Sequence, residues 1–430
     1  MIDKRAQYGA YINRGRVILH CDLNNFYASC ECALNPELRG HPVAVCGDIQ
    51  ARHGIILAKN ELAKKYGVKT AEPVWQAKQK CPCLVLVQAN YEHYMEYSHL
   101  SREIFCEYSN KVESFGEDEA WIDLTGSIHT KNLSDGAKIA DEIRNRIFKE
   151  LGLTASVGVS YNKIFAKLAS DYRKPDATTV FAPEDYLEII ANLPVSDMLY
   201  IGRSTSNILS GIGIHTIGQL ANLTEPFMKT LFGKNGITML ANARGENTDS
   251  VSDVGEEEEI KSIGNSSTPP KDLENEQEVK AMCYMLAESV GARLRQYNLK
   301  CNTIQISIRE SDLTTHEHQI KLEFSTNSTV TIANSAFRLF CSVYDWHIPV
   351  RSMGVRATNL ERADTPVQLS IFDDGISKRT KISKIDNTVD AIRDRYGYSS
   401  VQRGVLMCDK GLTNSNVKDE SKLKGVFKQH

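Results

Sequence analysis

The chain of 430 residues has no run of apolar residues long enough to cross a membrane. A spanning helix needs about 18 or more consecutive apolar residues, and no window of this sequence approaches that length. The first residues, MIDKRAQYGAYINRGR, are polar and lack the apolar segment of a secretory signal peptide. These absences predict a protein of the cytoplasm.

The sequence also lacks the cysteine spacing of a disulfide framework. Eleven cysteines are scattered irregularly, unlike those of small secreted domains. Cys30 and Cys32, like Cys81 and Cys83, are separated by one residue, which is closer than in the usual zinc motifs. We therefore expect reduced structural thiols, and a zinc site remains the weaker alternative.

The charge is nearly balanced overall, at −3, which argues against a uniformly basic surface. It is unevenly placed, however: residues 255–278 carry eight acids and two lysines, and residues 375–430 carry twelve Lys and Arg and six acids. This asymmetry predicts an acidic, loop-like connector and a basic tail suited to a phosphate backbone. Solvated surfaces without any partner would explain either segment equally well.

The first 180 residues alternate between strand-like and helix-like patterns, which predicts an α+β domain. Strands are expected at 17–22, 83–89 and 154–160, a hairpin at 115–126, and helices at 57–67, 91–109, 134–152 and 162–174. Beyond Pro194, short helical pieces alternate with glycine turns. After the acidic connector, the order helix, two strands, helix, strand predicts a small α/β module over residues 279–362.

Three consecutive acids, Glu117, Asp118 and Glu119, interrupt the apolar hairpin SFGEDEAWIDLTG. Neighbouring side chains of a regular strand point to opposite faces, but Gly116 permits a turn that would let Asp118 and Glu119 converge. Asp22 ends a different buried strand, and pairing of the two strands would bring all three carboxylates within reach of a divalent metal. Oxygen-only ligation favours Mg²⁺, and two such ions about 4 Å apart suit nucleotidyl transfer. A plain polar hairpin tip remains the alternative.

Four stretches occur in the order and at the spacing of the signature blocks of the Y-family (translesion) DNA polymerases: DLNNFYASCE, AKNELAKKYGVK, GEDEAWIDLTG and SVGVSYNKIFAKLASDYRKPD. The resemblance extends from Val17 to about Cys408 and is closest to the UmuC branch in its Gram-positive, UV-resistance form. It implies a template-directed, low-fidelity polymerase that copies damaged DNA from deoxynucleoside triphosphates. The implied fold is an α+β right hand with palm, fingers, helix-hairpin-helix thumb and a C-terminal α/β little finger.

The resemblance implies a site for two Mg²⁺ ions. Asp22 matches the first metal-binding acid, and Leu23 matches the residue that lends a backbone carbonyl to the metal. Asp118 matches the second metal-binding acid, and Glu119 matches the catalytic acid beside it, which also faces the metal.

Four further residues match positions that bind the nucleotide. Tyr27 matches the steric gate, whose ring leaves no room for a 2′-OH, and Phe26 would support the base or sugar. Lys64 on the fingers and Lys174 on the palm match basic residues that contact the triphosphate.

The sequence departs from the family pattern at three positions near the site. Asn24 stands where many relatives have Asp, and this departure resembles the UmuC branch. Ala58 and Glu61 stand where Thr and Tyr or Arg are common, so contacts of that helix with the triphosphate are less certain. Asp171 is expected to be a structural cap rather than a metal ligand.

Three later segments carry the resemblance to DNA-binding and tethering parts. IGRSTSNILSGIGIHTIGQL resembles the helix-hairpin-helix thumb, whose backbone N–H groups bind phosphates without reading sequence. KSIGNSST would place Lys261 and Ser262 against template phosphates. PVQLSIFDD contains a match to the sliding-clamp-binding pentapeptide, Gln368, Leu369, Ser370, Ile371 and Phe372, and such a peptide would tether the enzyme.

The expected division is as follows: palm 1–25 and 92–181, fingers 26–91, thumb 182–250, acidic linker 251–278, little finger 279–362, and a tail 363–430 with the clamp motif. No length remains for a proofreading exonuclease. The partners implied are primer–template DNA, the sliding clamp and a UmuD-like subunit, with a location at the nucleoid. Two alternatives stay open: a palm-type nucleotide cyclase, and a non-catalytic DNA-binding accessory protein descended from a polymerase.

Overall fold

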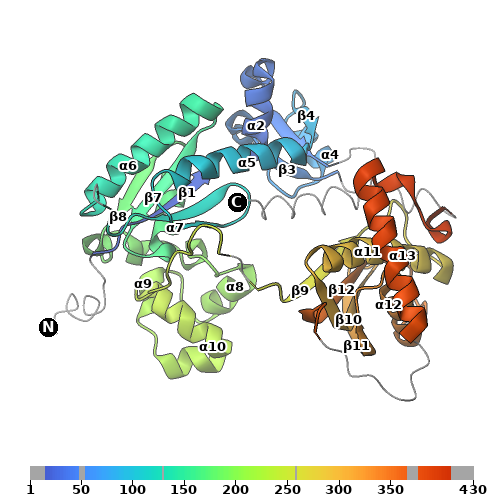
Figure 1. Cartoon of the computed structure of the whole chain (residues 1–430). Coiled ribbons are helices and arrows are strands. Elements are labelled where there is room, and N and C mark those ends of the chain that lie inside the picture. Colours follow the sequence, from blue (N-terminus) through green and yellow to red (C-terminus); the bar gives the residue numbers. More distant parts are fainter. Residues whose placement is uncertain (1–14, 48–53, 128–129, 257–258, 366–375, 408–430) are drawn as a thin grey trace. The chain divides into compact units, whose positions relative to one another are not determined.

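The structure is a computed structural model that describes residues 15–47, 54–127, 130–256, 259–365 and 376–407. These residues fall into two compact units that divide at residue 256 (Figure 1). Among the described residues, no helix has the length and hydropathy needed to span a bilayer.

A five-stranded sheet in the order β5-β6-β1-β7-β8 forms the centre of the first unit. Its strands are β1 (Ile18–Leu23), β5 (Val112–Ser114), β6 (Glu119–Asp123), β7 (Ala155–Ser160) and β8 (Thr178–Phe181). The central strand β1 pairs antiparallel with both β6 and β7, and β8 runs parallel to β7. The expected strands at 17–22 and 154–160 and the expected hairpin are confirmed.

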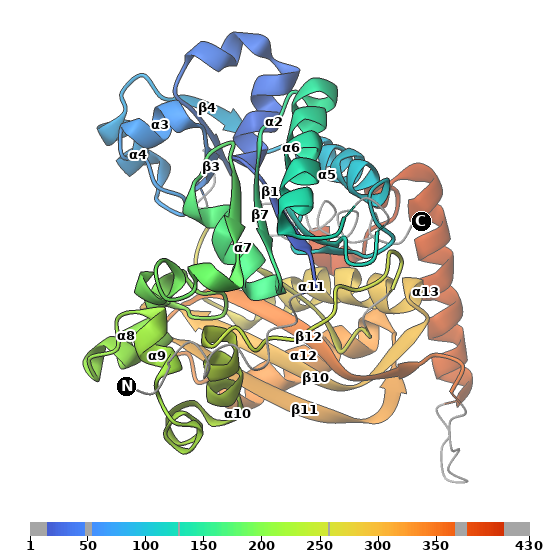
Figure 2. The same cartoon turned by 90° about the vertical axis from the view of Figure 1, so that its left-hand side faces the viewer.

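Helices cover both faces of this sheet (Figure 2). On one face, α5 (Tyr91–Cys106) and α6 (Leu133–Arg146) pack on the odd-numbered residues of β1, such as Leu19 and Cys21. On the other face, α7 (Lys163–Tyr172) packs on the even-numbered residues, so that Ile18 lies with Ala166. Because side chains alternate along a strand, β1 separates its residues between two different surroundings.

Gly158 of β7 allows α7 to lie directly on the sheet. A Cβ atom at this position would stand 1.9 Å from the carbonyl oxygen of Ala166 and 2.4 Å from the backbone nitrogen of Ser170. Both obstacles are backbone atoms of α7, so no side-chain rotation relieves them. A residue without a Cβ is therefore required for α7 to approach this closely.

A smaller sheet, in the order β3-β2-β4, follows the first helix. It contains β2 (Val43–Cys46), β3 (Ile56–Lys59) and β4 (Val85–Gln88), with α2 (Phe26–Leu34), the 3₁₀ turn Pro36–Gly40, α3 (Glu61–Lys65) and α4 (Val74–Lys80) beside it. The expected helix at 57–67 is wrong over its first residues. Ile56 is buried in the core of this sheet and Lys59 pairs with Ala44, so the helix begins only after Asn60, whose side chain caps it.

Short helices complete the first unit, as the glycine-rich pattern predicts. They are α8 (Arg203–Gly211), α9 (Ile217–Ala221) and α10 (Glu225–Ala243), preceded by 3₁₀ turns at Pro183–Asp185, Ile190–Asn192 and Val195–Asp197. The helix α10 is interrupted at Gly233, which has a φ of 62°.

Residues 251–254 belong to the first unit rather than to a linker. Val251 is buried beside Ile18 and Trp121. The backbone N–H of Ser252 donates to Glu113, and that of Val254 donates to the carbonyl of Asn110 (2.9 Å). The chain therefore leaves the first unit only after Val254.

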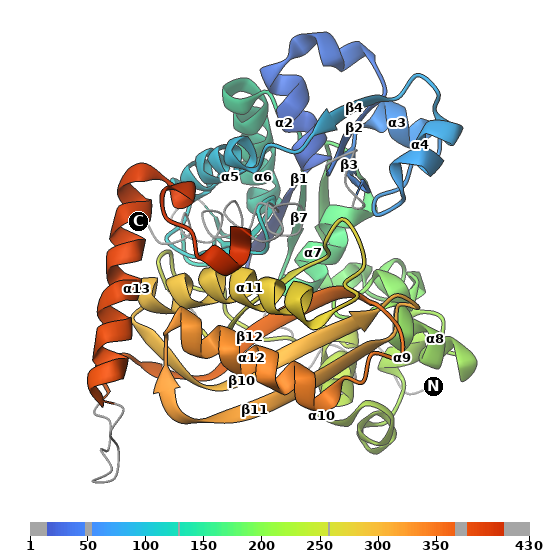
Figure 3. The same ribbon diagram turned by 90° about the vertical axis from the view of Figure 1, so that its right-hand side faces the viewer.

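The second unit is a four-stranded sheet in the order β11-β10-β12-β9, with α11 and α12 on one face (Figure 3). Its elements are β9 (Ser262–Ser267), α11 (Glu276–Gln296), β10 (Leu299–Glu310), β11 (Thr315–Thr326), α12 (Thr329–Val343) and β12 (Val350–Arg362). The expected loop at 255–278 is therefore wrong for β9, which pairs with β12 from Ser262↔Thr358 to Ser267↔Met353. Only Ile263 of this strand is buried, so the sequence carries no alternating pattern there.

The expected C-terminal tail is folded from Ile376 to Met407. It forms α13 (Ile376–Tyr396) and two 3₁₀ turns, Tyr398–Ser400 and Gly404–Met407. Glu288 of α11, which is 2% exposed, accepts hydrogen bonds from Arg393 (2.9 Å), Arg403 (3.1 Å) and Tyr398 (2.6 Å). Part of the basic charge that we expected to face DNA therefore neutralises a buried acid.

Candidate active site

Two of the predicted acids lie opposite each other on neighbouring strands. Asp22 at the end of β1 pairs with Glu119 at the start of β6. The N–H of Leu23 donates to the carbonyl of Asp118 (2.9 Å), which holds the preceding loop against β1. Gly116 has a φ of 84°, and this left-handed conformation makes the turn that we expected before Asp118. The structure thus brings together Asp22, Leu23, Asp118 and Glu119.

The carboxyl group of Asp118 lies in a negative environment. Burial, followed by the charges of Asp22 and Glu119, raises the pKa of Asp118 from 3.8 to about 7. A half-buried carboxylate with two acidic neighbours favours a proton or a cation that neutralises it. Since the donors are carboxylate and carbonyl oxygens, the residues fit a hard divalent cation such as Mg²⁺.

Two lysines supply positive charge beside these acids. The ammonium group of Lys167 on α7 lies 2.8 Å from Glu119 Oε2 and 3.2 Å from Asp22 Oδ2. Lys174 lies 2.5 Å from Asp22 Oδ2 and 2.8 Å from Asp171. Burial alone would lower the pKa of Lys167 and Lys174, but the surrounding carboxylates outweigh it and raise both above the ordinary value. Both lysines are therefore charged.

In this structure, Asp22 and Glu119 form ion pairs with lysines. Among the described residues, no group of three or more His, Cys, Asp and Glu side chains is arranged to hold a metal ion as it stands. Lys167 contacts one carboxylate oxygen of Asp22 and one of Glu119.

A buried histidine, His20, lies between Glu119 and α7. His20, two residues before Asp22, is fully buried, with Nδ1 2.9 Å from Ser170 Oγ and Nε2 3.3 Å from Glu119. Burial, followed by the charge of Lys167, holds the pKa of His20 well below its usual value. A neutral His20 therefore lies against Glu119 without adding charge to the site.

Tyr27, in the first turn of α2, packs against the rings of Tyr91 and Tyr94. Its ring stacks on Tyr94 with centroids 4.2 Å apart, and Tyr91 packs edge-on at 6.0 Å. Tyr94 is buried and donates a 2.6 Å hydrogen bond to Glu31. Burial, then the charges of Glu117 and Tyr91, raise the pKa of Tyr27. Phe26 is buried beside it, with ring centroids 5.6 Å apart.

The departures from the family pattern have structural roles. The amide of Asn24 donates to Ser156 (2.9 Å) and accepts from the N–H of Asp176 (2.8 Å), which fixes the loop after Lys174. Glu61 accepts from Asn25 (3.2 Å) and lies 3.5 Å from Lys64. Lys64 is thus connected to the start of α2 through Glu61, with its side chain 55% exposed.

Asp171 is a partner of both site lysines and not a cap. Its carboxylate lies 2.8 Å from Lys174 and 3.4 Å from Lys167. Sequence reasoning missed Lys167, His20 and Tyr94. The spacing of Lys167, four residues before Asp171 on a helix, was the one available signal. The clamp motif, Gln368–Phe372, lies outside the described residues.

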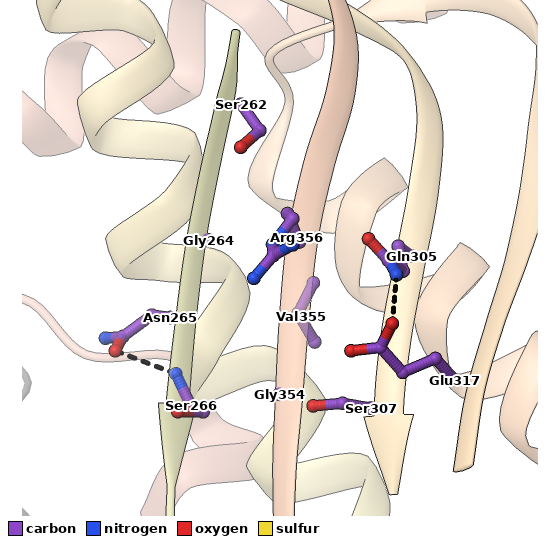
Figure 4. Close-up of a pocket in the computed structure, with 10 residues that line it drawn as sticks. All are labelled: Ser262, Gly264, Asn265, Ser266, Gln305, Ser307, Glu317, Gly354, Val355 and Arg356. Carbon is purple, nitrogen blue, oxygen red and sulfur yellow. Dashed lines mark hydrogen bonds between the residues drawn. The ribbon is translucent and has the colours of Figure 1, made fainter. Parts of the chain in front are cut away.

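The second unit has a polar hollow of about 380 Å³ on the sheet face opposite its helices (Figure 4). Small residues line it: Ser262, Gly264 and Ser266 from β9, Ser307 from β10 and Gly354 from β12. A Cβ at Gly354 would stand 2.4 Å from Ser307 Oγ, so glycine keeps this face flat. Arg356 is exposed at the hollow, and Gln305 donates to Glu317 across it (2.9 Å).

Comparison with known proteins gives the family. The chain matches the impB/mucB/samB family over residues 21–171 and the impB/mucB/samB family C-terminal domain over residues 260–371. It is 52% identical over 397 residues to DNA polymerase IV of Acetivibrio thermocellus, covering 92% of this chain and 99% of that protein. It is 35% identical over 414 residues to DNA polymerase IV 1 of Bacillus subtilis, covering 96% of each.

A solved structure has the same fold. The Y-family DNA polymerase chimera Dbh-Dpo4(243-245)-Dbh superposes with a TM-score of 0.71 and 24% identity over 80% of this chain and 98% of that chain. The expected α+β right-hand polymerase fold is thereby confirmed. The relatives carry the name DNA polymerase IV, so the UmuC branch stays a prediction, and neither the cyclase nor the non-catalytic alternative is favoured. The chain belongs to the impB/mucB/samB family, the Y-family DNA polymerases.

Proposed function

We propose that Asp22, Asp118, Glu119 and the carbonyl of Leu23 hold two Mg²⁺ ions for nucleotidyl transfer to a primer end. The observation that carries the proposal is the pairing of Asp22 with Glu119 on neighbouring strands, with the half-buried Asp118 held beside them by the hydrogen bond from Leu23 N–H to its carbonyl. Burial, followed by the charges of Asp22 and Glu119, raises the pKa of Asp118. Polymerases of this family copy DNA and use divalent metals. When bound, such a pair of ions neutralises and aligns the groups of an in-line displacement at phosphorus.

The chain's own residues bind and orient the nucleotide. Lys174, now 2.5 Å from Asp22, would exchange that carboxylate for the triphosphate. Lys64 on α3 would approach the same phosphates from the fingers, because Glu61 and Asn25 connect α3 to the start of α2. Ala58 has no hydroxyl to donate to the triphosphate, so Lys64 is the proposed contact from this part of the fingers.

Tyr27 is the proposed sugar gate. Its stacking on Tyr94, which Glu31 fixes, leaves the ring little freedom to move away from a bulkier sugar. A ring held in this way excludes a 2′-OH by contact rather than by charge. Phe26, buried against Tyr27, keeps the ring in place from behind.

Primer–template DNA is proposed to lie along the open sheet face of the second unit. Support comes from the polar hollow, which is lined by serine hydroxyls and by Arg356. Hydroxyl and guanidinium groups bind phosphates without reading the bases. The turn between α8 and α9 is the proposed phosphate contact of the thumb. The proposed parts are palm (1–25, 92–181), fingers (26–91), thumb (182–250) and little finger (279–362), the last now extended by β9 and α13.

Tethering to a sliding clamp is proposed for Gln368–Phe372, with a UmuD-like subunit as a possible further partner and the nucleoid in the cytoplasm as the location. The support is the sequence QLSIF and its position between β12 and α13. Changing Leu369 and Phe372 to Ala should leave extension of short primers intact and abolish stimulation by added clamp. Equal stimulation of both proteins would remove this role.

Primer extension with Mg²⁺ tests the metal site. The variant Asp118→Ala should extend primers at least about 100-fold more slowly. It removes one of the three carboxylates proposed to hold the Mg²⁺ ions. Asp123→Ala is the matched control, since Asp123 is an acid of the same strand, β6, outside the site. Equal rates for wild type and Asp118→Ala would refute the assignment.

A further inference from the structure

Lys167 is a second cation of the candidate active site, beside Lys174. It is held in the site by α7, and its side chain is only 12% exposed. Its ammonium group contacts Glu119 Oε2 (2.8 Å), Asp22 Oδ2 (3.2 Å) and Asp171 Oδ2 (3.4 Å). Lysines are rarely buried unless paired, and this one is paired with three acids.

Asp22 and Glu119 would repel each other without a cation that contacts both. Lys167 contacts both acids, whereas Lys174 contacts Asp22 but not Glu119. Asp22 and Glu119 are directly opposite on antiparallel strands, and like charges in that position destabilise a sheet. One ammonium group shared by both carboxylates offsets this repulsion. The oxygens that Lys167 contacts, Asp22 Oδ2 and Glu119 Oε2, belong to two of the carboxylates proposed to hold the divalent cation.

The packing of α7 fixes Lys167 in this place. Gly158 lets the backbone of α7 contact β7 directly, and Asn162 caps the helix by accepting from the N–H of Phe165 (2.8 Å). Ser170, one turn after Lys167, contacts His20 below Glu119 (2.9 Å). The lysine is therefore positioned by the fold and does not drift into the site from the surface.

We infer that Lys167 is a positioning residue that acts as the resident counter-cation of Asp22 and Glu119, holding both carboxylates in place and competing with a divalent cation for them. The inference rests on the proposed function, which assigns the divalent cation to these acids. It predicts that the free protein binds divalent cations weakly because a cation is already present. Removing the charge of Lys167 strengthens metal binding and destabilises the metal-free protein.

The test measures Mn²⁺ binding to the full chain without DNA or nucleotide. Electron paramagnetic resonance quantifies the Mn²⁺ that remains free. Lys167→Met and Lys167→Gln should bind Mn²⁺ at least about tenfold more tightly than wild type, since one nearby positive charge is removed. Lys167→Arg keeps the charge and should bind as wild type does. The Gln side chain still donates hydrogen bonds to carboxylates, so this variant gives the answer even where Met prevents folding.

Lys163→Met is the matched control. Lys163 is on the same helix, is 13% exposed, and pairs with Glu113 at 2.5 Å, away from the metal site. It should leave Mn²⁺ affinity unchanged. A second measurement is thermal unfolding: Lys167→Gln should have a lower midpoint without metal and gain more from added Mn²⁺ than wild type gains.

Three outcomes overturn the inference. They are unchanged or weaker Mn²⁺ binding by both neutral variants, an equal gain of affinity in Lys163→Met, and a gain of affinity in Lys167→Arg equal to that of the neutral variants. Asp118→Ala separates the two proposals, because it should abolish Mn²⁺ binding whatever stands at position 167. If Asp118→Ala binds Mn²⁺ as wild type does, the proposed metal site itself fails.

Discussion

Replacing Gly158 with Ala should separate α7 from the sheet and thereby disable the site. The added Cβ would stand 1.9 Å from the carbonyl oxygen of Ala166, about 1.5 Å short of ordinary contact near 3.4 Å. Since the Ser170 nitrogen is also too close at 2.4 Å, the helix backbone must move as a whole. Lys167, which reaches the site from the middle of α7, moves with it.

The expected losses follow from this displacement. Overpacking of a tight interface costs about 1–3 kcal/mol and sometimes more. Because the Cβ of Gly158→Ala would overlap backbone atoms of α7, which no side-chain rotation relieves, we place its cost at about 3 kcal/mol. A misplacement of about 1 Å near reacting groups costs about 100-fold in rate. We therefore expect single-turnover primer extension to slow by about 100-fold in protein that remains folded, as judged by urea unfolding.

Gly211→Ala is the control for this experiment. Gly211 is a glycine at the end of α8 with nothing within 4 Å of a built Cβ, so its replacement should be neutral or slightly stabilising. If Gly158→Ala unfolds at the wild-type urea concentration and extends primers within about threefold of the wild-type rate, then the close approach of α7 does not position the site.

Three further changes test other parts of the structure. Tyr27→Ala should raise ribonucleotide incorporation roughly 100-fold, while Tyr27→Phe keeps the stacked ring and the selectivity; equal selectivity in both would exclude the gate. Glu288→Gln should cost about 3 kcal/mol in urea unfolding because it leaves Arg393 and Arg403 without their buried partner, whereas a loss under about 0.5 kcal/mol, typical of surface changes, would contradict this. The hydrogen bond to Asp345 raises the pKa of His347, with burial opposing and Glu310 adding to the rise, so its stabilisation is full below the ordinary value of 6.5 and is lost as pH rises through the raised pKa. The melting temperature of His347→Gln should accordingly change less than that of wild type between about pH 6 and about pH 9, and parallel curves would refute the assignment.

The proximity of the three acids could be predicted from the sequence because local patterns determine the elements that carry them. An apolar run ending in Asp22 and a glycine turn before Asp118 specify a strand end and a hairpin, and pairing of those strands places Asp22 opposite Glu119. Only the partner strand had to be guessed. The stacking of Tyr27 on Tyr94 depends on how α5 packs on α2, which no local pattern contains.

Two elements escaped the sequence reading for physical reasons. The strand β9, SIGNSS, has one buried residue, and its backbone pairing with β12 replaces the missing apolar pattern. The helix α13 is attached through charges: Asp386, 2% exposed, accepts from Arg403 (2.7 Å) and from the N–H of Thr329 (3.2 Å). Arg403 binds the buried acids Glu288 and Asp386, so its charge is not available to a partner as the predicted basic tail would require.

The alternation of β1 explains why core and chemistry cannot be changed independently in this fold. Cys21 and Leu23 face α5 and α6, while His20 and Asp22 face α7, where His20 contacts Ser170 and Asp22 contacts Lys167. A slip of one residue in the pairing of β1 would reverse both sets, burying a carboxylate in an apolar core and presenting Cys21 to the cations. The free energy that opposes this slip is that of burying Asp22 unpaired, which far exceeds that of any single hydrogen bond in the sheet. The register that forms the core is therefore also what holds Asp22 opposite Glu119 in the absence of metal and DNA.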